Sequence, residues 1–125
     1  MRRQSIQYPE NCRRSKELGH LVDSACNNHQ PIVRAQLEKE PSLPGHDGNR
    51  WVTLHNYGAM EWNEIIECWR TVSQQLIRAA SAISPQAGER RLTVGGGDPI
   101  TLGFLVKDYV DHLLHHLRHI GIEVG

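Results

Sequence analysis

The chain has 125 residues, of which 38% are hydrophobic and 22% charged, and its formal net charge is zero. This length suits one domain with a single modest core. The neutral balance gives no electrostatic case for binding nucleic acid or an acidic membrane, and no apolar run approaches the ~18 residues of a transmembrane helix. Three cysteines without a C-x-x-C pair argue against a disulfide framework or a structural zinc ribbon, and they indicate a reducing, cytoplasmic setting.

The first half of the chain predicts one helix and a loop. Residues 1–14 are polar, basic and interrupted by Pro9, so we expect an irregular N-terminal tail, with residues 15–125 forming one helical domain. A helix is predicted from Ser15, as its N-cap, to about Glu38, and Pro31 should kink or divide it. Residues 41–49 hold two prolines and two glycines and predict a loop. Residues 51–57 predict either more loop or a short helical turn.

The second half predicts two further long helices. From Trp62 to Ile83 apolar residues recur with helical spacing, and Pro85 should end that helix. Residues 86–100 form a second loop, in which the triple glycine 95–97 is a flexible turn rather than a phosphate cradle. Thr101 is expected to cap a last helix that reaches Ile120. Three main helices and no strands predict the all-α fold class.

The last helix carries four of the eight histidines, and two of them form a candidate metal-binding pair. His112 and His116 are spaced i, i+4, which places both on one face. His116 falls inside the apolar stripe and His112 at its edge, whereas His115 and His119 fall toward the polar side. A buried imidazole pair needs partners for its nitrogens. Either a divalent metal or hydrogen bonding within the core would supply them.

A metal site needs at least one further ligand, and the spacing of residues does not identify it. The histidines outside the last helix are candidates: His20, His29, His46 and His55. On the first helix the apolar stripe contains His29 and lies opposite His20. Periodicity alone therefore favours His29, as a third ligand or as a core histidine.

Three segments together resemble the DinB superfamily, in particular its YfiT-like branch of metal-dependent hydrolases. They are KELGHLVDSACNNHQPIVRAQLE, DGNRWVTLHNY and TLGFLVKDYVDHLLHHLRHI. The resemblance spans Ser15 to Ile120 and implies an up-and-down four-helix bundle. In such a bundle one histidine of the second helix and an H-x-x-x-H pair of the last helix bind a divalent metal. Carried onto this chain, the implied ligands are His20, His112 and His116, with zinc as the metal and nickel, iron or manganese as alternatives.

The resemblance also implies a function. The family is similar in fold to transferases that use bacillithiol or mycothiol, so a hydrolase or a thiol S-transferase acting on a small molecule is expected. The alternative is a non-catalytic metal-binding or oligomeric module with an incomplete pocket. The family's usual first helix is not predicted before Ser15. Either the start of the chain is truncated, or a second copy covers the apolar face left exposed, and of the two we expect self-association as a homodimer. Asp23 and Asp108 are candidate hydrogen-bond partners of the ligand imidazoles, and the alternative for each, which the sequence favours, is an ordinary surface carboxylate.

Overall fold

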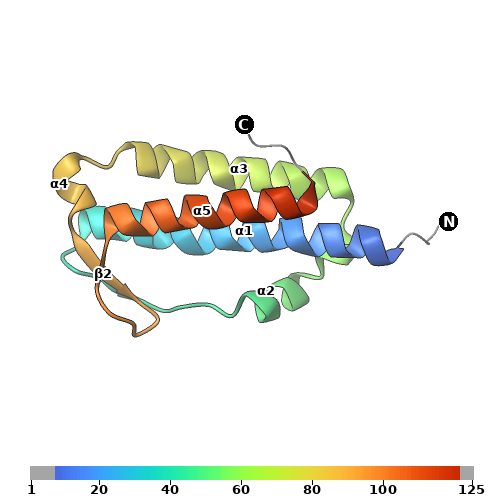
Figure 1. Ribbon diagram of the computed structural model, residues 1–125, viewed down its shortest axis with the longest axis horizontal. Helices are drawn as coiled ribbons and strands as arrows, with labels where there is room; N and C mark the ends of the chain where they lie inside the picture. The colour runs from blue at the N-terminus through green and yellow to red at the C-terminus, as the bar shows by residue number, and fades with distance from the viewer. Residues whose placement is uncertain (1–7, 122–125) are drawn as a thin grey trace.

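Three long helices run side by side and form most of the molecule (Figure 1). They are α1 (Tyr8–Leu37), α3 (Trp62–Ser81) and α5 (Leu102–Ile120). α1 packs against both α3 and α5. The computed structural model describes residues 8–121, with side chains from residue 12 onward. The all-α class with three main helices is confirmed.

The first helix is longer than the sequence predicts. It begins at Tyr8, so the predicted start at Ser15 and the irregular tail over residues 8–14 are wrong, and residues 1–7 lie outside the described part. Pro9 occupies the second position of the helix, where a missing N–H costs nothing, so it does not break the helix. Of the two effects predicted for Pro31, division of the helix is wrong, because the helix continues through it to Leu37, and a kink stays a prediction. Pro31 is buried beside Ile32, and packing there offsets the lost hydrogen bond.

The starts of the other two long helices follow local capping rules. α3 begins with a capping box, in which Glu61 and Glu64 each accept from the other's backbone N–H. The predicted cap of the last helix is confirmed, because Thr101 Oγ1 accepts a hydrogen bond from the Phe104 N–H at 3.1 Å. α5 ends at Gly121, which has φ +94°. A left-handed residue of this kind is favoured where a helix must stop.

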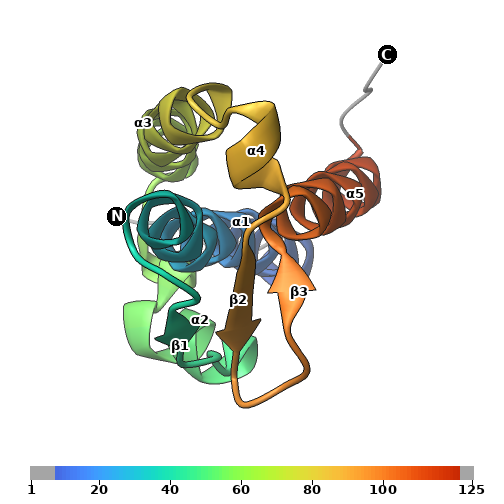
Figure 2. The same cartoon turned by 90° about the vertical axis from the view of Figure 1, so that its left-hand side faces the viewer.

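The two predicted loops contain a small sheet, so the absence of strands was a wrong prediction. β1 (Ser42–Leu43) pairs in parallel with β2 (Arg91–Val94), which pairs antiparallel with β3 (Ile100–Thr101). The triple glycine is the predicted turn, between β2 and β3, and Gly95 and Gly96 both have positive φ. Figure 2 shows the sheet across one end of the helices, with the short helix α4 (Pro85–Gly88) above it. β1 thereby ties the first loop to the second.

Between β1 and α3 the chain forms a short helix that lies on α1. α2 spans Gly48–His55, and a single 3₁₀ turn, η1, spans Tyr57–Ala59. The Asp47 side chain caps α2 by accepting from the backbone N–H groups of Asn49 and Arg50. Asn56 ends it in the left-handed conformation at φ +52°. The short helical turn predicted for this region is therefore confirmed.

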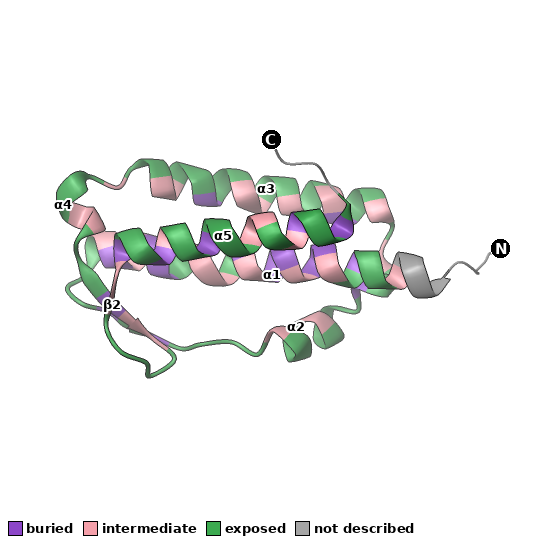
Figure 3. Ribbon diagram, viewed as in Figure 1, coloured by how far each residue is buried: buried purple, intermediate pink, exposed green. Residues whose placement is uncertain are grey.

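The core consists of two apolar clusters along α1 (Figure 3). The first lies toward the sheet and joins residues of all three long helices and of strands β1 and β2: Ala25, Ile32, Ala35, Leu43, Leu76, Leu92, Leu102, Leu105 and Tyr109. The second lies toward the start of α1 and includes Leu18, Leu21, Val22, Tyr57, Ile65, Leu117 and Ile120. Among the described residues no helix is both long and apolar enough to span a membrane.

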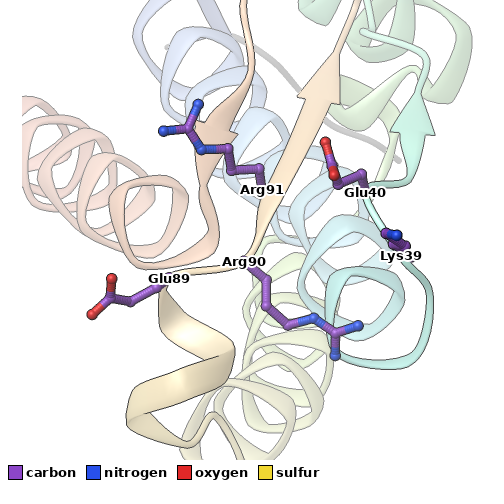
Figure 4. Close-up of a pocket in the computed structure, with 5 residues that line it drawn as sticks. All are labelled: Lys39, Glu40, Glu89, Arg90 and Arg91. Atoms are coloured by element: carbon purple, nitrogen blue, oxygen red, sulfur yellow. The ribbon is translucent and has the colours of Figure 1, made fainter.

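A charged pocket of about 520 Å³ lies where α1 ends, at the opposite end of the bundle from the end of α5. Figure 4 shows its lining, with the Arg90 side chain extended toward the end of α1. The Arg90 guanidinium donates to the carbonyl oxygens of Gln36 and Glu38 at 3.0 and 3.3 Å. These carbonyls belong to the end of the helix, which carries partial negative charge. Arg90 therefore closes the helix end.

Candidate metal centre

Two of the three proposed ligands meet across the interface of α1 and α5. The imidazole rings of His20 and His116 have centroids 4.9 Å apart and are nearly perpendicular. His20 lies on the face of α1 that turns toward α5, while His29 lies on the α3 side, in a small pocket with Val72 and Gln75. Because α1 packs against two helices, the position of a residue relative to the apolar stripe does not fix which neighbour that residue faces. The structure thus pairs His116 with His20, the histidine of α1 that the periodicity did not favour.

A carboxylate faces the second histidine of this pair. Glu17 lies one turn before His20 on α1, and its Oε1 is 3.5 Å from His116 Nδ1 and 3.3 Å from His119 Nδ1. At 3.5 Å the contact with His116 is too long for a good hydrogen bond. His116 Nδ1 is accordingly buried without a hydrogen-bond partner. An unsatisfied imidazole nitrogen at this point fits a bound cation.

The environment of His20 favours the neutral form of its imidazole, which is the form that binds a metal. Burial lowers the pKa of His20, and the neighbouring His116 and His46 lower it further. The start of α2 also lies close against the ring, since a Cβ on Gly48 would be 3.0 Å from His20 Cε1. Metals bind neutral imidazole, so this lowered pKa favours a ligand role.

The third proposed ligand does not join the pair in this structure. His112 is exposed on α5, and so are His115 and His119, as predicted for those two. Within the described part of the chain, no group of three or more His, Cys, Asp or Glu side chains is arranged to hold a metal ion. His20 and His116 therefore fit a divalent metal by their chemistry. The structure does not show His112 beside them.

Asp23, His55 and Tyr57 form a polar cluster that the sequence did not predict. Asp23 is only 1% exposed, and its Oδ1 accepts a hydrogen bond of 2.6 Å from the Tyr57 hydroxyl. The same oxygen lies 3.0 Å from His55 Nδ1. Burial and the bond to Asp23 raise the pKa of Tyr57 far above its ordinary value. Asp23 was expected to support His20, but its short contacts are with His55 and Tyr57, while Asp108 is exposed.

One sequence signal could have located part of this cluster. Glu17, His20 and Asp23 are spaced i, i+3, i+6 and so share one face of α1. Nothing local marks His55 or Tyr57, which reach Asp23 only because α2 folds back onto α1. Cys12, Cys26 and Cys68 are free thiols. Partial burial and the Asp23 carboxylate raise the pKa of Cys26, so its thiol is not activated as a nucleophile.

Comparison with known proteins identifies a family. The family model of the DinB superfamily matches residues 15–120, which covers α1 from its second turn to the end of α5. A search of curated proteins and a search of solved structures each found no match to the chain. The match includes His20, His112 and His116.

Proposed function

Because this chain belongs to the DinB superfamily, we propose that it binds a divalent metal and acts as a metal-dependent hydrolase or thiol S-transferase. His20, His112 and His116 are the proposed ligands, and zinc is the proposed metal, with nickel, iron or manganese as alternatives. The observation that carries the proposal is the contact between His20 and His116, whose rings are 4.9 Å apart on different helices. These two residues are 96 positions apart in the chain (116 − 20), and at their contact His116 Nδ1 is buried without a hydrogen-bond partner.

His112 is within reach of this pair. It precedes His116 by four residues on α5, which corresponds to about 5–6 Å between Cβ atoms. Its side chain is exposed, so a change of rotamer meets little packing resistance. We expect a bound cation to draw His112 toward His116. Glu17, whose Oε1 is 3.5 Å from His116 Nδ1, would then add a negative charge beside the cation.

A divalent ion bound by three imidazoles keeps an open position and, when bound, supplies a Lewis acid that favours a deprotonated water or thiol at neutral pH. The protein's own contribution is to hold the imidazoles at the α1–α5 interface and to cover His20 with the start of α2. Trp51, on the same short helix, is 37% exposed and offers an aromatic surface for a small substrate. A small molecule, including a low-molecular-weight thiol, is the substrate class that we propose.

Metal stoichiometry tests the ligand set directly. We expect one divalent ion per chain in the wild type, and loss of binding in His20→Gln, His112→Gln and His116→Gln. His115→Gln and His29→Gln are matched controls, because the first side chain is exposed and the second lies on the α3 side. Both should bind metal as the wild type does. Retained stoichiometry in His20→Gln with loss in His29→Gln would show that the ligand set is wrong.

The reaction class requires an activity assay on the metal-loaded chain. A thiol with an electrophilic substrate tests S-transfer, and panels of esters and amides test hydrolysis. Activity that disappears with His116→Gln and persists with His115→Gln would support an enzyme. Inactivity throughout, with metal bound, would favour the alternative of a non-catalytic module.

We further propose that the chain self-associates as a homodimer. α3 and α5 both lie beside α1 (Figure 2). On the outer faces of these helices Ile77 is 58% exposed and Val110 is 41% exposed. On α3, Trp69 Nε1 and Ser73 Oγ are buried without hydrogen-bond partners. A monodisperse monomer by light scattering at micromolar concentration, unchanged in Ile77→Glu and Val110→Glu variants, would refute self-association.

A further inference from the structure

The buried carboxylate of Asp23 is hard to explain as a stabilising feature. It is 1% exposed and lies on α1 among the buried side chains of Leu21, Val22 and Ala25. Only Oδ1 has partners, and Oδ2 is buried with none. Taking a carboxylate out of water with one oxygen unsatisfied destabilises the folded chain. A buried group that destabilises the fold in this way is a candidate for function.

The partner of this carboxylate is placed to exchange protons with solvent. His55 Nδ1 lies 3.0 Å from Asp23 Oδ1, yet the His55 side chain is 42% exposed. One edge of the imidazole therefore meets the buried carboxylate while the rest of the ring remains accessible. A carboxylate at hydrogen-bonding distance holds the proton on Nδ1, which leaves the lone pair on Nε2. An imidazole in this state is a proton acceptor with a defined direction.

The same short helix brings His55 to the histidine pair. Gly48, the first residue of α2, lies against His20, and His55, its last residue, lies against Asp23. Asp23 follows His20 by three residues, so their Cβ atoms are about 5–6 Å apart on one face of α1. The rings of His46, Trp51 and His55 form a chain of contacts, with centroids 5.7 and 5.9 Å apart. His46 also acts electrostatically on His20.

We propose that His55 is the proton-transfer residue of this site and that Asp23 positions it, for a nucleophile that carries an O–H or S–H bond. This inference rests on the proposed function, because it assigns the proton in that reaction. His55 Nε2 takes the proton of the nucleophile, and the electron pair of that bond forms the new bond to an electrophilic carbon of the substrate. The leaving group departs with its bonding pair and receives the proton from Nε2. His55 returns to the neutral form.

The arrangement of the proton on His55 can be measured without a substrate. In ¹⁵N-labelled wild-type chain at a pH well above 7, we expect NMR to show His55 with its proton on Nδ1. Free imidazole side chains mostly carry it on Nε2, so the exposed His112 and His115 are internal references. A proton on Nε2 of His55 would overturn the proposal, and this test needs no variant.

Chemical reactivity separates positioning from packing. Diethyl pyrocarbonate acylates neutral imidazole, and mass spectrometry of peptides reports each histidine separately. We expect Asp23→Asn to lower the acylation rate of His55 about fivefold or more, and the rates of His112 and His115 to stay constant. A purely structural role predicts the opposite, because loosened packing would expose His55 and raise its rate. Tyr57→Phe, which removes the other donor to the same oxygen, should leave the His55 rate within about twofold.

Metal binding distinguishes failure of this inference from failure of the proposed function. His55→Gln should keep the wild-type metal stoichiometry and, once a substrate is known, should lower kcat/KM by about 10²–10⁴-fold. If the wild-type chain binds no metal, the proposed function is wrong, whereas the NMR test of the proton on His55 is unaffected. An unchanged kcat/KM in His55→Gln would overturn the proton-transfer role alone.

Discussion

Replacing Gly19 by alanine should destabilise the chain, although the same change usually stabilises a helix. Gly19 lies in the middle of α1 against the buried ring of Tyr57. A Cβ on Gly19 would lie 2.5 Å from Tyr57 Cε2 and closer still to Cδ2 and Cγ. The ring cannot easily move, because its hydroxyl is bonded to Asp23 and its face packs in the second core cluster. The added methyl group must therefore displace Tyr57.

The magnitude follows from three effects. Alanine in place of glycine gains about 1 kcal/mol of helix propensity. Overpacking costs about 1–3 kcal/mol, and loss of a hydrogen bond to a charged group costs about 1.5–3 kcal/mol. We expect the free energy of unfolding to fall by about 2–4 kcal/mol in Gly19→Ala, seen as a lower urea midpoint at unchanged m-value.

A double-mutant cycle identifies the cause. With Tyr57→Ala the ring is gone, so adding Gly19→Ala should stabilise by about 1 kcal/mol, which gives a coupling of about 3–5 kcal/mol. Gly88→Ala is the matched control, because its Cβ would meet only Ile83 Cγ2 at an ordinary 3.8 Å. It should change stability by no more than about 0.5 kcal/mol. A Gly19→Ala chain more stable than wild type would refute the reasoning.

Three further predictions concern the helix cap, the approach of α2 and the response to acid. Thr101→Ala removes the acceptor for the Phe104 N–H and should cost about 1 kcal/mol in urea unfolding, whereas Thr101→Ser should retain wild-type stability. Gly48→Ala places a Cβ 3.0 Å from His20 Cε1, so it should weaken metal binding about tenfold in calorimetric titration, with little effect on the urea midpoint. In the metal-free chain, stability should fall as the pH drops below 6.5, because unfolded His20 takes up a proton there while burial and His116 lower its folded pKa. The loss should end below the folded pKa, and His20→Gln should flatten this part of a stability profile over about pH 5–8.

The long helices could be predicted because their signals are local. The apolar spacing of α3 and the Thr101 cap of α5 depend on residues within a few turns. The strands have no such signal, since β1 and β3 are two residues each and exist only through pairing between distant segments. Pro9 was misleading for a different reason: proline breaks the interior of a helix but suits its first turn. Whether a proline ends a helix therefore depends on its position in that helix.

The candidate site could also be predicted only where its signals are local. Periodicity on α5 identified His116 as inward-facing, and the structure places it against His20. Periodicity placed His112 at the edge of the apolar stripe, and its side chain is exposed in the structure. On α1 periodicity favoured His29, although this helix packs against two others and His20 faces one of them. The family resemblance supplied His20, and the metal role of all three histidines remains a prediction.

The sheet gives the distant end of the molecule an influence on this site. Ser42 and Leu43 pair with Thr93 and Val94, which anchors the chain just before it reaches His46 and the start of α2. The anchored stretch is short, so α2 is held against α1 at both ends, by the sheet on one side and by Tyr57 on the other. Without that constraint an eight-residue helix with no buried residue of its own would have little reason to stay folded there. His55 and Gly48 reach α1 because the strands and Tyr57, rather than α2 itself, fix the position of this helix.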